Sequence, residues 1–566
     1  MERNTSGTGE GIRVALALLL ACALLMLPLW WQGGSQGHDL FHHLLSGHYF
    51  ARQLWQGELY PRWLMAMNGG FGSPTFFFYP PLPYYVSALF AGPGAHPQQA
   101  IYPLLGSATL ALLLSGVFAY LWLRATTPPG RALAASLLYL ALPYHVAMDL
   151  YARFALAEFW AFAWAPLILL GQDLAHRGLR QGLPLLILGL ALLAFSHLPS
   201  LLLMMGLVTL RAFWFARRTR TLTPCWQALG AQGMGLCMAA ALLLPALADQ
   251  GAISMELMRG GMFDFRRNFL DRLPSGWGDW RFRGHLAWQS LLTLALLLIA
   301  WAAAREPRHP ELLCWGALGV GAFLMMLPLS QPLWSLLPPL QRVQFPWRLN
   351  LILTLATVAV VALGTPTHRP WQWLWWGTLL LTLITTTAMI ARTFGVYAHR
   401  IIPLAPGNVW IPAYAAAIVI LLMWVNLAGS RLVGRLAIVL VGIKMTVLAI
   451  LLVYGLTQAE VSRVESLGFS SPTTLLGTVG LTFLAYSGYG QITNAADAVE
   501  RPERTIPLAL LMAVSIVAVF YVGLAWVALG TVPIAELKLH ADTAMAQVAH
   551  PLFGPAGVVI LALTAM

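Results

Sequence analysis

Residues 12–31 read IRVALALLLACALLMLPLWW, a run of twenty residues in which an arginine is the one charged side chain. A helix of about 20 apolar residues matches the hydrocarbon thickness of a bilayer. The run is long for the core of a cleavable signal peptide, and Arg3 and Arg13 stand before it and at its start. We therefore predict an uncleaved first membrane span with an inner N-terminus.

The whole chain is also unusually apolar. Of its 566 residues 59% are hydrophobic and 10% are charged, whereas about a quarter are charged in an ordinary soluble domain. Soluble cores stop growing near 250–300 residues, so a soluble enzyme, a disordered chain and a nucleic-acid-binding domain are excluded. The four cysteines show no CxxC or zinc-type spacing, which also argues against a disulfide scaffold or a zinc finger. We predict an all-α polytopic membrane protein with about 16 transmembrane helices.

The few charged residues divide between two sets of loops. When crossings are counted from an inner N-terminus, one set carries arginines and the other carries carboxylates, as the positive-inside bias predicts. This division requires residues 183–213 to be two short helices broken at Ser196-His197-Leu198-Pro199. The predicted inner arginines are Arg124, Arg131, Arg177, Arg180, Arg211, Arg217, Arg218, Arg220, Arg305, Arg308 and Arg369, and the predicted outer carboxylates are Asp39, Glu58, Asp149, Glu158, Asp249, Glu256, Asp264, Asp271 and Asp279.

Two long outer segments, residues 32–100 and 248–286, differ from simple spans. The first holds dense aromatics and prolines, including Phe76-Phe77-Phe78-Tyr79-Pro80-Pro81, which favours an interfacial helix and a re-entrant loop. The second is rich in Arg, Asp, Gly and Trp. Because functional groups concentrate on loops held by a rigid scaffold, we expect chemistry in these segments.

Asp39 directly follows the first span, beside His38. A carboxylate held there could take a proton from an acceptor hydroxyl, while a neighbouring His or Arg steadies its charge. If residues 38–50 form a helix, His38 and His42 share a face, as do Asp39 and His43. The alternatives are a polar interfacial helix and, less favoured, a histidine metal site.

Further candidates carry charge near the outer face. Glu158 lies inside an apolar run, where a carboxylate is costly unless it faces protein or water. Arg153 follows an aspartate by four residues, so a local salt bridge is the alternative. His197 breaks an apolar run and could equally be a structural histidine. Arg348 stands beside Trp347 at the outer start of a predicted span, where an arginine could bind a phosphate or anchor the interface.

These residues carry a resemblance over about residues 1–385. Their order is similar to bacterial membrane proteins labelled "6-pyruvoyl-tetrahydropterin synthase-related", which resemble GT-C glycosyltransferases. The motifs are His38-Asp39, Leu59-Tyr60-Pro61-Arg62-Trp63, Phe78-Tyr79-Pro80-Pro81-Leu82, Arg153 to Glu158 and Gln344-Phe345-Pro346-Trp347-Arg348. The resemblance implies sugar transfer from a polyprenyl-phosphate donor at the outer face, with Asp39 in the catalytic place of the first outer loop. A single Asp39 stands where many members carry paired acidic residues, so metal dependence stays open.

This resemblance gives a candidate site and mechanism. Asp39 would act as general base on the acceptor, and arginines would neutralise the departing lipid phosphate. The candidate catalytic residues are Asp39, His38 and Glu158, and the candidate substrate-binding residues are Arg62, Arg153, His197 and Arg348.

The C-terminal part contains a helix-weakening run, Tyr486-Ser487-Gly488-Tyr489-Gly490, inside an apolar span. An unwound membrane helix frees backbone groups that can bind a substrate's carboxylate or amine, and a Gly-rich packing face is the alternative. Lys444 lies in mid-span, where an ammonium must find a partner or lose its proton. A coupling role for Lys444 is therefore a candidate.

Residues 386–566 resemble an incomplete amino acid permease of the APC superfamily, covering spans three to eight of that fold. The resemblance rests on Ala391-Arg392-Thr393-Phe394-Gly395, residues 425–431 and residues 493–507. It implies that Tyr486, Ser487 and Gly488 contact an amino acid and that Lys444 serves proton coupling. The Gly-rich broken first span of that fold is missing, so we expect no independent amino acid transport by this part.

Of three functions that the sequence allows, we favour the first, and the other two are alternatives. The first is a membrane glycosyltransferase, the second an amino acid permease-type transporter in the C-terminal part, and the third a fused or misassembled reading frame without function as a unit. The expected partners are membrane lipid, a polyprenyl-phosphate sugar donor and amino acids, and no nucleic acid. We expect a multi-pass protein of the bacterial cytoplasmic membrane without a cofactor, and a divalent metal stays open.

Overall fold

The structure is a computed structural model in which the chain forms two compact units, Met1–Leu379 (unit 1) and Leu380–Met566 (unit 2), which are described separately. Every regular element in the described part of the chain is a helix, which confirms the predicted all-α membrane fold. The described residues are 5–35, 37–94, 99–252, 260–270, 280–304, 306, 308–364, 387, 390–399, 401–402, 410–427, 430–465, 501–539 and 544–565.

The predicted number of about 16 spans is not confirmed. Among the described residues eight helices are long and apolar enough to cross a membrane, or ten if each of two bent pairs counts as one span. The run predicted at 183–197 becomes a helix of 13 residues, Gly182–Ala194, which is only about 20 Å long. Hydropathy finds apolar runs but does not distinguish a crossing helix from a short one buried in protein.

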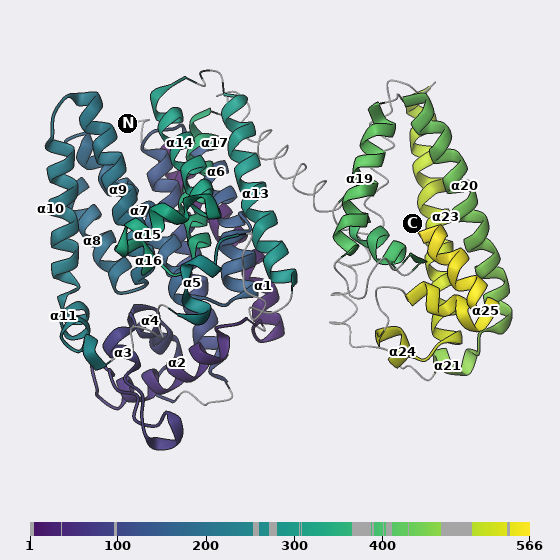
Figure 1. The fold of residues 1–566 in the computed structure, drawn as a ribbon, viewed down its shortest axis with the longest axis horizontal. Helices are drawn as coiled ribbons and strands as arrows, with labels where there is room; N and C mark the ends of the chain where they lie inside the picture. The colour runs from purple at the N-terminus through teal and green to yellow at the C-terminus, as the bar shows by residue number, and fades with distance from the viewer. Residues whose placement is uncertain are drawn as a thin grey trace. The chain divides into compact units, whose positions relative to one another are not determined.

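Unit 1 is a bundle of helices, several of which begin with a proline in their first turn, where its missing N–H costs nothing. Figure 1 shows their arrangement. Its helices are α1 (Thr5–Gln32), α2 (Leu40–Trp55), α3 (Thr75–Phe78), α4 (Leu82–Ala91), α5 (Ile101–Arg124), α6 (Pro129–Ala141), the π-helix η3 (Tyr144–Ala152), α7 (Leu156–His176), α8 (Gly182–Ala194), α9 (Leu198–Thr219), α10 (Thr223–Met238), α11 (Ala240–Ala248), α13 (Trp280–Ala302), α14 (Pro310–Met325), α15 (Gln331–Leu336), α16 (Pro338–Gln341), the 3-10 helix η8 (Pro346–Leu349) and α17 (Asn350–Gly364).

Helix α7 forms the centre of unit 1. Nearly all its side chains are buried, and it packs most extensively on α8 and α5. A helix that is apolar on every face is typical of such a position. At Gly171 a Cβ atom would meet the backbone of Leu186 on α8. Glycine therefore allows the two backbones to approach closely.

The two ends of unit 1 differ in charge. At one end Arg177 donates to the carbonyl of Ala125 at 2.7 Å, and Arg218 pairs with Glu311 at 3.0 Å. We call this the arginine end, because the described loops with Arg124, Arg177 and Arg218 lie there. At the other end α2, α3 and α4 lie across the bundle (Figure 1). Helix α8 ends at Ala194 and α9 begins at Leu198. Residues 183–213 are therefore two helices, as the division of charged residues between inner and outer loops required.

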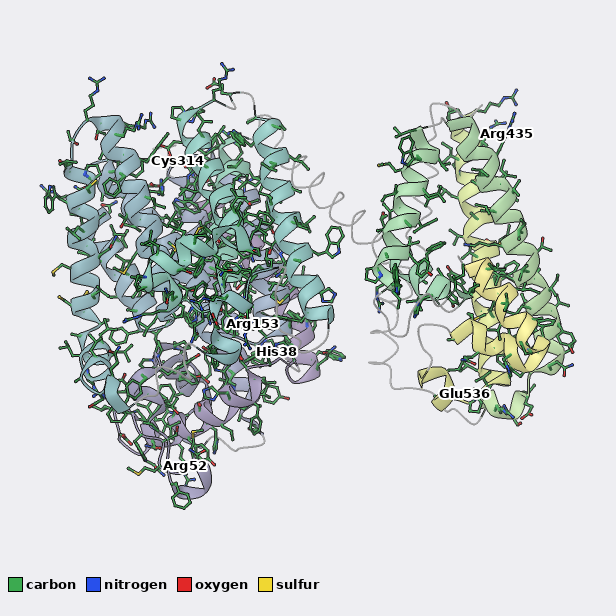
Figure 2. The ribbon with its side chains drawn as sticks, viewed as in Figure 1. His38, Arg52, Arg153, Cys314, Arg435 and Glu536 are labelled. Carbon is green, nitrogen blue, oxygen red and sulfur yellow. The ribbon has the colours of Figure 1, made fainter. Side chains whose placement is uncertain are left out.

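Unit 2 pairs α20 with α23 and α25 around a small apolar core that includes Leu451 and Leu524. Only 11% and 6% of the apolar windows of α20 and α23 are buried, against 89% for residues 346–364 of unit 1. Arg435 and Glu536 lie at opposite ends of the unit (Figure 2). The elements are α19 (Ile411–Leu427), α20 (Ser430–Gln458), α21 (Val461–Glu465), α23 (Pro502–Thr531), α24 (Ile534–Leu539) and α25 (Ala544–Ala565).

Candidate functional site

The loop between α1 and α2 contacts the end of the π-helix η3. The backbone N–H of Asp39 donates to the carbonyl of Arg153 at 2.8 Å, and the carbonyl of Asp39 accepts from the N–H of His43 in α2. Phe154 has a φ of 55° as the chain turns from η3 into α7. A Cβ at Gly37 would lie 2.7 Å from the Arg153 carbonyl oxygen. Glycine therefore lets this loop reach the turn.

Arg153 joins three carboxylates. Its Nη1 donates to Asp149 Oδ1 at 2.8 Å and to Glu158 Oε2 at 3.0 Å, and its Nη2 lies 3.9 Å from Asp39 Oδ2. Asp149, Arg153 and Glu158 are buried, whereas the Asp39 side chain is 41% exposed. Asp39 is thus the accessible end of a buried ionic network.

Arg348 completes this network from the 3-10 helix η8, directly before α17. Its Nε donates to Glu158 Oε2 at 3.1 Å, and its Nη1 donates to the carbonyl of Val343 at 2.8 Å. The hydroxyl of Tyr144 donates to the other oxygen of Glu158 at 2.6 Å. The carboxylate of Glu158 is therefore compensated on both oxygens, as a buried charge requires. We call Asp39, Asp149, Arg153, Glu158 and Arg348 the Asp39 network.

Neutral aromatic groups surround the open side of the network. His43 Nδ1 lies 2.6 Å from the hydroxyl of Tyr84, which is hydrogen-bonded to Tyr79. Burial lowers the pKa of His43 to about 3, helped by the neighbouring His42 and Arg153. Burial and the charge of Asp39 raise the pKa of Tyr79 well above its ordinary value. The groups that line this side therefore stay uncharged near neutral pH.

The condition of a helix over residues 38–50, on which His38 and His42 would share a face, is not met at its start. Helix α2 begins at Leu40 with Asp39 as its N-cap residue, because the backbone of Asp39 is bonded to Arg153 instead of continuing a helix toward His38. His38 and His42 therefore do not share a helix face. The ring of His38 lies 5.0 Å from that of Phe282, and partial burial lowers the pKa of His38.

The structure brings most of the predicted residues of unit 1 together. Asp39, Glu158, Arg153 and Arg348 belong to one network. His38 lies close enough to Asp39 and Arg153 to interact with their charges, and Figure 2 labels it next to Arg153. His197 bonds Ser200 at 2.8 Å and lies close enough to Glu158 and Arg348 to interact with their charges.

Arg62 is the exception among these candidates. Its Nη2 donates to the carbonyl of Ala241 at 3.0 Å, and its guanidinium lies over the rings of Tyr60 and Phe77. None of these contacts belongs to the Asp39 network. Its surroundings are those of an anchor between the loop and α11.

Tyr144 and Tyr84 were missed as site residues by sequence reasoning, whereas His43 was expected near Asp39. Tyr144 precedes Glu158 by fourteen residues and reaches it through the wide turn of η3. No local spacing signals such a contact. Tyr84 lies beside the Tyr79-Pro80-Pro81 run, and that aromatic density was the available signal.

In the C-terminal part, Lys444 lies half-buried in the middle of α20. The predicted substrate contacts Tyr486, Ser487 and Gly488 lie outside the described residues. Across the described parts of both units, no group of three or more His, Cys, Asp or Glu side chains is placed to hold a metal ion. In the Asp39 network, the positive charge of Arg153 lies between the carboxylates.

Comparison with known proteins distinguishes the two parts of the chain. Residues 361–566 match the amino acid permease family model. The inner membrane transport protein YbaT of Escherichia coli is 38% identical over 188 residues, which are 33% of this chain and 44% of the relative. An uncharacterized protein of Methanocaldococcus jannaschii is 31% identical over 190 residues, 33% of this chain and 43% of the relative.

A mouse b(0,+)-type amino acid transporter 1 is 26% identical over 156 residues, covering 26% of this chain and 32% of the transporter. The chain thus spans less than half the length of these relatives. The permease resemblance of the C-terminal part is confirmed at this level. The family match leaves residues 1–360 outside it, and their resemblance to GT-C proteins stays a prediction.

Proposed function

We propose that the chain serves amino acid transport across a membrane and that unit 2 carries this function. The permease family match over residues 361–566 is the observation that supports it best. The relatives named as transport protein and amino acid transporter support the same class. We therefore now favour transport over glycosyl transfer, which the sequence alone favoured.

Within this proposal Lys444 couples transport to proton movement. Tyr486, Ser487 and Gly488 contact the amino acid. An ammonium in mid-span is costly unless it has a function or a partner, and Lys444 occupies such a place in α20. We place the protein in the bacterial cytoplasmic membrane with its N-terminus and arginine end inside, because loops rich in arginine remain on that side.

Uptake into proteoliposomes tests this proposal. The full chain is reconstituted, and uptake of a labelled amino acid mixture is compared with empty vesicles and with Lys444→Met. Saturable uptake that falls in Lys444→Met while Arg435→Gln, at one end of the same helix, retains it would support transport. No uptake and no amino-acid-dependent rise in Tm would overturn it. The experiment also decides the expectation that this incomplete set of spans does not transport by itself.

A second function, sugar transfer in unit 1, is favoured by the Asp39 network. Asp39 is partly exposed, it is held by its backbone to Arg153, and its charge faces a buried guanidinium at 3.9 Å. A positioned carboxylate of this kind can accept a proton from an acceptor hydroxyl. Arg153 and Arg348 would stabilise negative charge on a departing polyprenyl phosphate. Arg62 has no part in this version, since its contacts lie elsewhere.

Sugar transfer is tested with the reconstituted chain and a polyprenyl-phosphate-linked sugar donor. Asp39→Asn should abolish turnover while leaving expression and Tm unchanged. Asp249→Asn, an exposed carboxylate beyond α11, is the matched control and should keep full turnover. Equal turnover in Asp39→Asn and the control would remove Asp39 from the mechanism.

A further inference from the structure

A partly open cavity, lined by apolar as well as charged side chains, lies at the arginine end of unit 1. It has a volume of about 130 Å³ and lies where the ends of α5, α7, α9, α14 and α17 meet. Figure 2 shows Cys314 of α14 at this end and Arg153 toward the other, so the cavity is separate from the Asp39 network. The residues that decide its chemistry are Asp173, His176, Arg177, Arg211, Glu311 and Trp315.

Both carboxylates of the cavity are already compensated. Asp173 accepts from Arg211 Nη2 at 2.8 Å and from Trp122 Nε1 at 3.0 Å. Glu311 accepts from Arg218 Nη1 at 3.0 Å. Arg211 of the lining balances the charge of Asp173, and Arg218, which lies outside the lining, balances that of Glu311. Among the described lining residues, Arg177 is therefore the one charge without an opposite partner.

Positive groups with unused donors line the same space. Arg177 bonds only a backbone carbonyl, that of Ala125 at 2.7 Å, among its described partners. Arg211 is 2% exposed, and its Nε–H has no acceptor in the described part of the chain. The guanidinium of Arg211 is fixed between the rings of Phe215 at 5.0 Å and Trp315 at 4.6 Å. A buried donor without an acceptor is costly, so it points to a ligand that accepts.

We propose that this cavity binds a phosphate-bearing anion, held by Arg177 and Arg211. Arginine donors suit the oxygens of a phosphate, and basic pockets between membrane helices bind lipid head groups. The cavity is small beside the roughly 300–1,000 Å³ pockets of drug-sized ligands, so it admits one phosphate group and not a nucleotide. The phosphate can belong to an anionic lipid head group or to free phosphate. This site does not depend on the proposed transport or sugar transfer.

The test uses the full chain in phosphatidylcholine nanodiscs. One arm adds phosphatidylglycerol to the nanodiscs, and the other adds inorganic phosphate to the buffer. Bound lipid is counted by native mass spectrometry, and the Kd for phosphate is measured with the radiolabelled ion. Arg177→Gln removes a cavity donor, and Arg180→Gln, an exposed arginine of the same loop, is the matched control.

We expect saturable binding of one equivalent that weakens at least tenfold in Arg177→Gln and less than twofold in Arg180→Gln. Binding in the lipid arm alone identifies a head group, and binding in the phosphate arm alone identifies the free anion. If Arg177→Gln has a much lower Tm, Thr126→Trp at the exposed wall of the cavity replaces it and should reduce binding equally. Equal loss in Arg177→Gln and Arg180→Gln, or no saturable binding in either arm, overturns the proposal.

Discussion

At the residue scale, Arg153 determines how the charges of unit 1 are arranged. Its guanidinium contacts Asp149, Glu158 and Asp39, and its carbonyl holds the backbone of Asp39. One side chain and its own backbone thus connect a buried network to an accessible carboxylate. The position of Asp39 depends on how closely the preceding loop can approach Arg153.

Gly37→Ala should therefore displace Asp39. The new Cβ would lie 2.6 Å from Phe154 Cβ and 2.7 Å from the Arg153 carbonyl oxygen, so loop and turn must separate. We expect a lower Tm and greater access of Asp39 to a water-soluble carboxyl reagent, measured by mass spectrometry. Gly11→Ala in α1, where nothing lies within 4 Å of the new Cβ, is the control and should leave both unchanged. Identical labelling of Asp39 in the two variants would contradict the prediction.

His43 should make the protein less stable in acid. Its pKa is about 3 in the folded protein because of burial, and about 6.5 when unfolded. The unfolded chain thus binds the proton more readily, so this contribution is full above pH 6.5 and is lost as the pH falls toward 3. The loss amounts to about 2 kcal/mol between pH 7 and pH 5.

The measurement is the Tm in detergent between pH 7.5 and pH 4.5. His43→Asn should reduce the fall in Tm on acidification, because the variant has no group to protonate there. His309→Asn, an exposed histidine, should follow the wild-type curve. If His43→Asn and the wild type lose Tm in parallel, the buried imidazole is not responsible.

At the scale of elements, the side chain of Glu158 in α7 connects this helix to η3 and η8 by hydrogen bonds and ion pairs. It accepts from Tyr144 and Arg153 on one side of the chain and from Arg348, 190 residues later, on the other. The elements that meet at the Asp39 network are thus joined by charge as well as by packing. Removing the Glu158 carboxylate should therefore destabilise the packing of all three helices.

Glu158→Gln should lower the free energy of unfolding by about 3–5 kcal/mol, since it removes the carboxylate partner of the buried Arg348 and one of the carboxylates around Arg153. The exposed pair of Glu460 and Arg463 gives the comparison. Glu460→Gln should cost at most about 1 kcal/mol, because solvent screens that pair. Chemical denaturation in detergent measures both variants. A Glu158→Gln variant as stable as Glu460→Gln would show that the network contributes little.

At the scale of the whole molecule, the two units should unfold separately. The apolar windows of the candidate spans are 28% to 89% buried in unit 1, against 11% and 6% in unit 2. All four cysteines, Cys22, Cys225, Cys237 and Cys314, belong to unit 1. The reactivity of the buried Cys22 and Cys314 toward a thiol dye therefore reports the unfolding of unit 1 alone.

We expect Glu158→Gln to lower the temperature at which Cys22 and Cys314 become reactive. The melting of unit 2, followed by limited proteolysis near α23, should stay at the wild-type temperature in the same variant. Proteolysis that shifts by the same number of degrees as thiol reactivity would mean that the two units unfold as one.

The sequence pattern alone determined that lipid surrounds most of this chain, and that arginines and carboxylates lie in different sets of loops. The apolar runs predicted membrane helices, and the count of arginines predicted which loops of unit 1 share an end, because both depend on short stretches read one at a time. The pattern did not determine how many apolar runs become full membrane spans. Some runs form long helices such as the 24-residue α5, and others form short ones such as the 13-residue α8, and the packing of neighbouring helices decides which.

Only the tertiary structure decided which charges meet. Asp39, Glu158, Arg153 and Arg348 were all candidates, yet their union in one network and the separation of Arg62 depend on contacts between residues as far as 190 positions apart. The anion cavity likewise joins five helix ends and has no local motif. Packing fixes such contacts because each buried charge must find its partner across the bundle.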